Sequence, residues 1–204
     1  MIAIIDYGMG NLRSVEKGFQ KVGVDVTVTN RPEVVEKADG VVLPGVGAFR
    51  DCMQELTNLK LIDAVVDAIN KGKPYLGICL GLQILFSESE EFGTCKGLGI
   101  LKGKVVRFKN GDLKIPQMGW NELNIKQKSP LLLDIPDKSY FYFVHSYYVA
   151  PVDDSITLTS TDYGVEFVSS VCRDNIFAVQ FHPEKSQALG LKMLENFGKI
   201  VYGK

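Results

Sequence analysis

The chain has 204 residues, of which 46% are hydrophobic and 23% charged, a composition typical of an ordinary soluble globular protein. Its 23 basic and 24 acidic residues leave a net charge of −1, which argues against a nucleic-acid-binding surface. No apolar run approaches the ~20 residues that span a bilayer, so we expect no membrane segment.

The cysteines favour a reducing, cytoplasmic compartment. Cys52, Cys79, Cys95 and Cys172 show no C-x-x-C or other paired spacing, and the chain opens on a strand-like run instead of a signal peptide. No linker, repeat or low-complexity tract interrupts the sequence. We therefore expect a single domain over residues 1–204.

The first half of the chain alternates short apolar runs with amphipathic helical patterns. Asn11 precedes the first helical stretch, and Gly23 marks the end of that helix. In chain order, the pattern predicts a strand at 1–5, a helix at 12–22, strands at 24–28 and 41–43, a helix at 61–70, a strand at 75–78 and a helix at 82–86. Strands separated by helices in this way predict βαβ units around a parallel sheet.

The second half is richer in β-branched and aromatic runs, which are typical of antiparallel strands. Strands are predicted at 104–108, 140–149, 156–160, 165–171 and 177–181, with a turn at Asn110-Gly111 and a closing helix at 189–202. The predicted fold is therefore α/β. It is a mixed sheet with a parallel, doubly wound part flanked by helices and an antiparallel extension.

One strand–turn–helix has the form of a nucleophile elbow. In Gly77-Ile78-Cys79-Leu80-Gly81, the two glycines remove side chains where strand and helix crowd each other, so that Cys79 is exposed at the sheet edge. A cysteine at a helix N-terminus is favoured as the thiolate. A buried structural cysteine between packing glycines is the alternative interpretation of this motif alone.

The base must be one of two histidines, because the chain contains only His145 and His182. His182 follows a predicted buried strand and is followed by Pro183 and Glu184. Residues two apart on an extended segment project to the same side, so Glu184 is placed to hold the imidazole while the other ring nitrogen faces a thiol. His145 lies within a predicted strand, where we interpret it as a structural histidine.

A glycine-containing loop, Pro44-Gly45-Val46-Gly47-Ala48-Phe49, follows the third predicted strand. Such a loop lets backbone N–H groups approach a substrate closely, as an oxyanion hole requires. A phosphate-binding loop is the competing interpretation. Because both G-x-x-x-x-G-K-[ST] and a complete G-x-G-x-x-G after the first strand are absent, nucleotide binding is disfavoured.

Cys, His and Glu in this order, with the loop upstream, resemble the class I (triad) glutamine amidotransferases, and among these the glutaminase subunits of imidazole glycerol phosphate synthase. The resemblance covers essentially the whole chain. Its motifs are Asp6-Tyr7-Gly8-Met9-Gly10-Asn11-Leu12, Pro44-Gly45-Val46-Gly47-Ala48-Phe49, Gly77-Ile78-Cys79-Leu80-Gly81, Met118-Gly119-Trp120-Asn121, Tyr142-Phe143-Val144-His145-Ser146-Tyr147 and His182-Pro183-Glu184-Lys185-Ser186. The chain departs from the family at Gln117, where a histidine is usual.

The resemblance implies a flavodoxin-like fold and a role for each matching residue. Cys79 would be the nucleophile, His182 the general base and then acid, and Glu184 its orienting carboxylate. Backbone N–H groups of Leu80 and of the Val46–Gly47 peptide would form the oxyanion hole. Glutamine would be held by Gly47, Gln83, Ser146 and Tyr147, and the side facing a synthase partner, where ammonia is handed over, would include Asn11, Met118, Trp120, Tyr142 and Lys185.

The same resemblance implies hydrolysis of L-glutamine to glutamate and ammonia, without metal or cofactor. The ammonia would pass to a (β/α)₈ cyclase subunit in a heterodimer, which makes imidazole glycerol phosphate and AICAR in histidine biosynthesis. The alternative is a paralogous subunit that feeds ammonia to an amidating partner in surface-polysaccharide sugar synthesis. A non-catalytic binding module is the third hypothesis, and the intact triad disfavours it.

Overall fold

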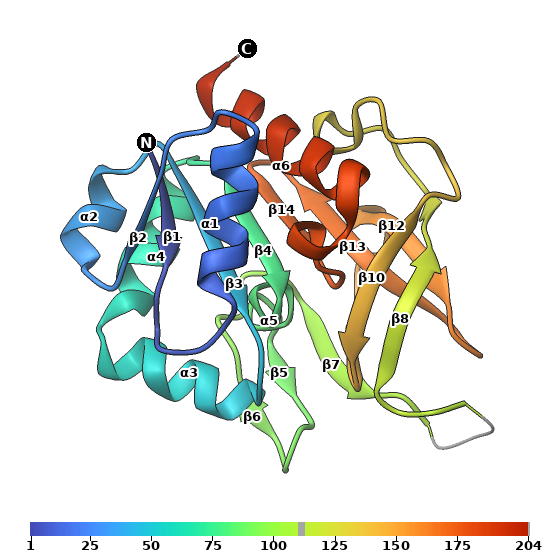
Figure 1. Cartoon of the computed structure of the whole chain (residues 1–204). Coiled ribbons are helices and arrows are strands. Elements are labelled where there is room, and N and C mark those ends of the chain that lie inside the picture. The colour runs from blue at the N-terminus through green and yellow to red at the C-terminus, as the bar shows by residue number, and fades with distance from the viewer. Residues whose placement is uncertain (110–112, 204) are drawn as a thin grey trace.

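A long mixed sheet forms the centre of the protein (Figure 1). The structure, a computed structural model, describes residues 1–109 and 113–203, and within them twelve strands form this sheet while two others pair separately. Its strand order is β2-β1-β3-β4-β14-β13-β11-β7-β5-β6, with β12 and β9 attached beside β13. The predicted turn at Asn110-Gly111 lies outside the described residues.

The strands fall into two groups along the chain. The first and last form the parallel part: β1 (Ile2–Ile5), β2 (Val26–Thr29), β3 (Gly40–Gly45), β4 (Tyr75–Cys79) and β14 (Ile176–Val179). The others are β5 (Glu88–Ser89), β6 (Cys95–Lys96), β7 (Gly103–Arg107), β8 (Gln117–Glu122), β9 (Asn124–Ile125), β10 (Tyr140–His145), β11 (Tyr147–Pro151), β12 (Thr157–Asp162) and β13 (Glu166–Arg173).

Helices cover both faces of the parallel part (Figure 1). They are α1 (Leu12–Lys21), α2 (Pro32–Lys37), α3 (Phe49–Asn58), α4 (Leu61–Asn70), α5 (Leu80–Gln83) and α6 (Gln187–Tyr202), with short 3₁₀ helices at Pro130–Leu132, Asp154–Ile156 and Pro183–Lys185. Asn11 caps α1, because its side chain accepts a hydrogen bond from the Ser14 N–H.

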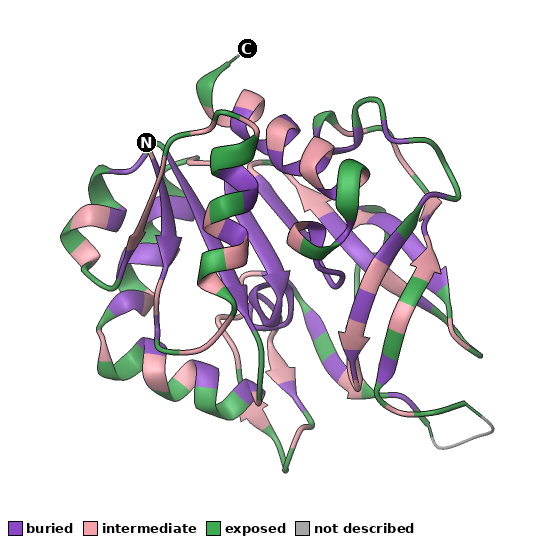
Figure 2. Cartoon of the chain, in the orientation of Figure 1, coloured by how far each residue is buried: buried purple, intermediate pink, exposed green. Residues whose placement is uncertain are grey.

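The alternation of side chains along β1 shows why these strands are apolar throughout. Ile2 and Ile4 belong to the core formed with α1 and α6, whereas Ala3 and Ile5 belong to the core formed with α2, α3 and α4. Figure 2 shows the central strands buried along their length, while β8 and β10 carry exposed residues. The predicted α/β fold with an antiparallel part is therefore confirmed.

Several predicted boundaries were wrong. The single strand predicted at 140–149 is two strands, which are separated at Ser146. β10 pairs only with β8, and β11 joins the main sheet. The helix expected at 82–86 is α5, which starts at Leu80 and has four residues. The prediction also missed α2, α3, the six-residue strand β8 and the two-residue strands β5, β6 and β9. Within the described residues, no helix is long and apolar enough to cross a membrane.

Candidate active site

Three neighbouring parallel strands bring the predicted motifs to one edge of the sheet. β4 lies between β3 and β14, and the register pairs Gly45 with Cys79 and Val179 with Ile78. Because parallel strands end on the same side, the loop after β3, the cysteine at the end of β4 and His182 after β14 meet there. The pattern of the sequence placed these three motifs correctly at a common edge.

Cys79 has the strained backbone of a nucleophile elbow. Its φ of 56° and ψ of −104° are unusual for a residue with a side chain, and such conformations persist only where the surroundings enforce them. A Cβ on Gly77 would overlap the Gly81 carbonyl, and a Cβ on Gly81 would overlap the Leu43 carbonyl. The glycines therefore remove side chains where β4, α5 and β3 crowd together.

His182 and Glu184 form a buried pair. The His182 Nδ1 atom lies 2.8 Å from Glu184 Oε1, and both side chains are 3% exposed. The reason expected from the sequence was wrong, because Pro183–Lys185 is a 3₁₀ helix and not an extended segment. Its tight turn, begun by Pro183, brings the carboxylate back to the imidazole.

The second ring nitrogen of His182 has no hydrogen-bond partner among the described residues and is buried. Burial alone would lower the pKa of His182, but its interactions with the nearby Cys79 and Glu184 outweigh burial and raise this pKa to about 10. The imidazole is therefore charged at neutral pH. A positive ring beside a sulfur is the arrangement that favours a reactive thiolate.

Backbone hydrogen bonds tie the His182 segment to β10. The His182 N–H donates to the Tyr142 carbonyl at 2.9 Å, and the Tyr142 N–H donates to the Ser186 hydroxyl oxygen at 3.0 Å. The Ser186 hydroxyl in turn donates to the His182 carbonyl at 2.7 Å. The position of the imidazole is consequently linked to a strand that lies outside the main sheet.

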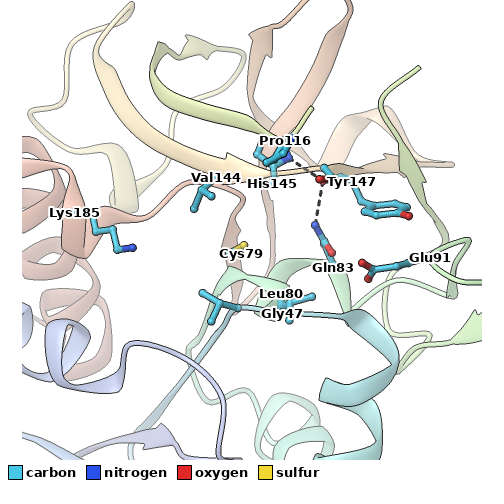
Figure 3. Close-up of a pocket in the computed structure, with 12 residues that line it drawn as sticks. Gly47, Cys79, Leu80, Gln83, Glu91, Pro116, Val144, His145, Tyr147 and Lys185 are labelled. Carbon is cyan, nitrogen blue, oxygen red and sulfur yellow. Dashed lines mark hydrogen bonds between the residues drawn. The ribbon is translucent and has the colours of Figure 1, made fainter. Parts of the chain in front are cut away.

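Cys79 opens into a pocket of about 410 Å³ (Figure 3). Eight predicted site residues line it: Val46, Gly47, Cys79, Leu80, Gln83, Ser146, Tyr147 and Lys185. His182 and Glu184 do not line it, and both side chains are buried. A pocket of this size, with several converging polar groups, is typical of a site for a small polar molecule.

Two segments, residues 46–47 and Leu80, line the pocket with Cys79. Gly47 has a φ of 101°, a conformation that glycine adopts without strain, and its neighbour Val46 also lines the pocket. Leu80, the residue after the nucleophile, lies on the same wall. All three residues therefore share the pocket with Cys79.

Glu91 lines the same pocket and was missed by the sequence analysis (Figure 3). Its Oε2 accepts a hydrogen bond from the Phe49 N–H at 2.7 Å, at the start of α3. The only signal was the acidic stretch at 88–91, and charged stretches usually lie on solvated faces. Glu91 therefore adds a carboxyl group to the pocket that Cys79 also lines.

Gln180 is the second missed residue. It is fully buried, and its Nε2 donates a hydrogen bond to the Cys79 Sγ at 3.5 Å. Gln83 is linked to it, since the Gln83 Nε2 donates to Gln180 Oε1 at 3.0 Å and to the Tyr147 carbonyl at 3.1 Å. In the sequence, Gln180 appears only as one polar interruption in an apolar run.

His145 occupies the structural position that its strand predicted. Its Nδ1 donates to the Tyr147 carbonyl at 2.8 Å, and its Nε2 lies 2.9 Å from the side-chain amide of Gln117. The ring packs among Phe108, Phe143 and Phe167. Burial lowers its pKa to about 4, so His145 is neutral at pH 7.

The residues predicted to face a partner lie outside the pocket, except Lys185. Met118 and Trp120 on β8 are exposed, and the Trp120 ring packs edge-on against Tyr142 of β10. Lys185 joins the two regions, because it lines the pocket and its Nζ lies 5.8 Å from the Tyr142 ring centre. Asn11 lies at the start of α1, which it caps.

Metal ligands do not gather in the part of the chain that the structure describes: no group of three or more His, Cys, Asp or Glu side chains is placed to hold an ion. Cys52, Cys95 and Cys172 are free thiols and do not line the pocket. The residues of the site can support nucleophilic attack by Cys79 with proton transfer by His182.

Sequence comparison gives one family for almost the whole chain. Residues 3–201 match the family model described as glutamine amidotransferase class-I. Imidazole glycerol phosphate synthase subunit HisH of Syntrophotalea carbinolica is 54% identical over 98% of this chain and 100% of its own length. The protein of the same name from Aquifex aeolicus is 55% identical over 95% of this chain and 94% of its own length.

Solved structures share the fold. PurLQS from Thermotoga maritima has a TM-score of 0.77 at 18% identity, covering 100% of this chain and 98% of that one. The glutaminase domain of CTPS from Trypanosoma brucei has a TM-score of 0.73 at 20% identity, covering 100% and 94%. At these identities, the likeness concerns the fold alone.

Proposed function

Since the chain belongs to the class-I glutamine amidotransferase family, we propose that its pocket hydrolyses L-glutamine with Cys79, His182 and Glu184 as the catalytic residues. The protein is the glutaminase subunit of imidazole glycerol phosphate synthase, and the ammonia it releases serves histidine biosynthesis. One observation carries the assignment of the residues: Cys79, at the end of β4, lines a polar pocket, and the buried His182–Glu184 pair follows the adjacent strand β14.

Recognition of glutamine follows from the charges of the pocket. The Glu91 carboxylate complements the α-ammonium group of the substrate, and it is held in place by the Phe49 N–H. Gln83, Ser146, Tyr147 and Gly47 supply the neighbouring polar and backbone contacts. A small zwitterion is thereby fixed with its side-chain carboxamide directed towards Cys79.

The first half of the reaction forms a thioester. The Cys79 sulfur attacks the side-chain carbonyl carbon of glutamine, and the peptide N–H groups of Leu80 and Gly47 stabilise the oxyanion. The C–N bond then breaks as protonated His182 donates its proton to the leaving nitrogen, which departs as ammonia. Glu184 holds the imidazole at Nδ1 and stabilises its charge, so that Nε2 remains the atom that transfers the proton.

The second half regenerates the enzyme. His182, now neutral, removes a proton from a water molecule that attacks the thioester carbon. The C–S bond breaks, its electron pair returns to sulfur, and glutamate leaves. The triad thus ends with the charges it had at the start: a thiolate, an imidazolium and a carboxylate.

The ammonia goes to a (β/α)₈ cyclase subunit, which docks on the exposed side of β8 and β10 in a heterodimer. Met118, Trp120 and Tyr140 are large exposed side chains on these strands. Aromatic residues and Met are enriched in interfaces, and a cluster of them on one surface is a typical docking site. Tyr142 and Val144 lie on the same face of β10 as Tyr140, and Val144 lines the pocket.

This face therefore leads from the glutamine site, past Lys185 and Tyr142, to the docking surface. Ammonia released at Cys79 would move along this face into the partner, which would use it to make imidazole glycerol phosphate and AICAR. The same proposal includes a single domain over residues 1–204, a cytoplasmic location and a position for Asn11 at this interface. The surface-polysaccharide alternative gains no support from the relatives.

Labelling of the full chain with a glutamine-analogue electrophile, in complex with the cyclase, tests the nucleophile. We expect Cys79 to be modified at least about a hundredfold faster than Cys52, and free glutamine to protect it. Equal labelling of the two cysteines, or modification that glutamine does not slow, would rule out Cys79 as the glutamine-attacking residue.

A further inference from the structure

Gln180 has no place in the Cys79–His182–Glu184 triad, yet it contacts the reacting sulfur. It follows β14 directly, its backbone N–H donates to the Ser169 carbonyl at 2.8 Å, and its side chain is 0% exposed. The Nε2 of its carboxamide lies 3.5 Å from the Cys79 Sγ. Burying a carboxamide is costly unless its polar atoms are hydrogen-bonded, so the partners of both atoms determine what this side chain can do.

The orientation of this carboxamide is fixed by a chain of hydrogen bonds. The Tyr147 carbonyl can only accept, so the nitrogen of Gln83 must face it, at 3.1 Å. The other hydrogen on that nitrogen then points to Gln180, whose oxygen accepts it at 3.0 Å. Because the oxygen of Gln180 is used in this way, its N–H group is the part that faces the Cys79 sulfur.

A fixed N–H donor at a sulfur distinguishes the thiolate from the thiol. A thiolate accepts this hydrogen bond with its full charge, whereas a thiol is a weak acceptor. Gln180 is fully buried and Cys79 is only 6% exposed, and in such low-dielectric surroundings a hydrogen bond is electrostatically stronger than in water. The donor is therefore most useful whenever negative charge resides on sulfur, before the attack and again when the thioester is cleaved.

We propose that Gln180 is a catalytic residue of this glutaminase: its carboxamide N–H stabilises the Cys79 thiolate, while its oxygen fixes Gln83 towards the substrate. The inference rests on the proposed role of Cys79 as nucleophile. Gln180 makes no covalent bond and transfers no proton. In the second half of the reaction, it stabilises the sulfur as the C–S bond breaks and the electron pair returns to it.

Alkylation of Cys79 by iodoacetamide tests this inference without requiring glutamine to bind. The rate would be measured against pH in the full chain, by mass spectrometry of the Cys79 and Cys95 peptides. Gln180→Met keeps the length and removes both polar groups. We expect its Cys79 rate at pH 7 to fall about tenfold or more, and the half-maximal rate to move about one pH unit higher.

Gln180→Glu places a carboxylate oxygen, an acceptor, beside the sulfur. We expect a larger loss at pH 7 than in Gln180→Met, because the two negative groups repel each other. Thr159→Val is the matched control, since Thr159 is equally buried in the same sheet, hydrogen-bonds Ser169 and Ser170 and does not line the pocket. It should keep the wild-type alkylation profile. The Cys95 rate should stay the same in all variants.

Wild-type alkylation rates and pH profile at Cys79 in both Gln180 variants would overturn the proposal. If one variant does not fold, as judged by circular dichroism, the alkylation profile of the other decides between the two outcomes. A failure of the proposed function has a different signature. In that case, Cys79→Ser retains glutamine hydrolysis in the complex and wild-type Cys79 reacts no faster than Cys95.

Discussion

Nδ1 of His182 lies 2.8 Å from Oε1 of Glu184, and the other carboxylate oxygen is buried without a partner among the described residues. The main task of the carboxylate is therefore to orient the imidazole and to stabilise its positive charge. Removing its charge should cost more than removing an exposed ion pair, because burial strengthens the interaction.

Glu184→Gln tests that task with little change of shape. We expect kcat for glutamine to fall about 10²–10⁴-fold, because the amide no longer stabilises the imidazolium or fixes its orientation. The measurement is steady-state glutaminase activity in the complex with the cyclase. Glu195→Gln on the exposed face of α6 is the control and should keep the wild-type rate. A Glu184→Gln enzyme with wild-type kcat would contradict the assignment.

The nucleophile elbow should tolerate no side chain at Gly81. A Cβ there would overlap the Leu43 carbonyl, which is fixed in β3. We expect Gly81→Ala to lower the free energy of unfolding by about 3 kcal/mol or more, as overpacking of a core does. Urea denaturation would measure it.

Gly72→Ala separates crowding from backbone strain. Gly72, unlike Gly81, has a positive φ, of 79°, and a Cβ there meets nothing within 4 Å. We expect a loss of only about 1 kcal/mol, the cost of the left-handed conformation. Equal losses in the Gly72 and Gly81 variants would show that steric overlap at the elbow is unimportant.

Stability should fall in mild acid because of His145. In the unfolded chain, its pKa is near the ordinary 6.5, whereas burial lowers the folded value to about 4. Between these values, the unfolded chain binds a proton that the folded chain does not. The contribution of His145 is therefore complete above pH 6.5 and is lost as pH falls towards 4, by about 2 kcal/mol at pH 5.

His145→Gln isolates this contribution. The variant loses packing against Phe108, Phe143 and Phe167, so its stability at pH 7 should be lower than that of the wild type. The informative quantity is the difference in unfolding free energy between pH 7 and pH 5, which should be smaller in the variant. An unchanged difference would mean that His145 does not titrate as described.

The docking surface is tested by Trp120→Ala. The Trp120 side chain is 45% exposed and is supported by Tyr142, so its removal should leave the isolated chain folded. Tryptophans at interface centres commonly contribute about 2 kcal/mol or more, so we expect the Kd for the cyclase to rise at least about 30-fold. Isothermal titration calorimetry would measure it.

Tyr202→Ala serves as the control for that experiment. Tyr202 is also a partly exposed aromatic residue, but it lies at the end of α6 beside Asp25. Its removal should leave the Kd unchanged. If Trp120→Ala bound the cyclase as tightly as this control, the partner would not dock on β8.

The sequence predicted the parts of this site that lie within one short segment. The glycines around Cys79 and the proximity of His182 to Glu184 are local features, and adjacent parallel strands bring them together. Even there, the reason for the His182–Glu184 contact was wrong, since a 3₁₀ turn and not an extended strand makes it.

What escaped prediction depends on contacts between distant segments. The N-terminus of α3 has no local capping side chain. Instead, the carboxylate of Glu91, 42 residues away, accepts a hydrogen bond from the Phe49 N–H. The role of Gln180 depends on its hydrogen bond to Cys79, which lies 101 residues earlier in the chain. The division between β10 and β11 at Ser146 could not be predicted, because the two strands are similarly aromatic and only the pairing of β10 with β8 distinguishes them.

The most direct test of Cys79 as the nucleophile compares two nitrogen sources in the complex with the cyclase. For Cys79→Ala, we predict a loss of at least about a thousandfold in glutamine-dependent synthesis, because no nucleophile remains. Synthesis from added ammonium salts should keep the wild-type rate, because ammonia enters the partner without the glutaminase step. Retention of both activities would contradict this role, since Cys79 would then not be the residue that releases ammonia from glutamine.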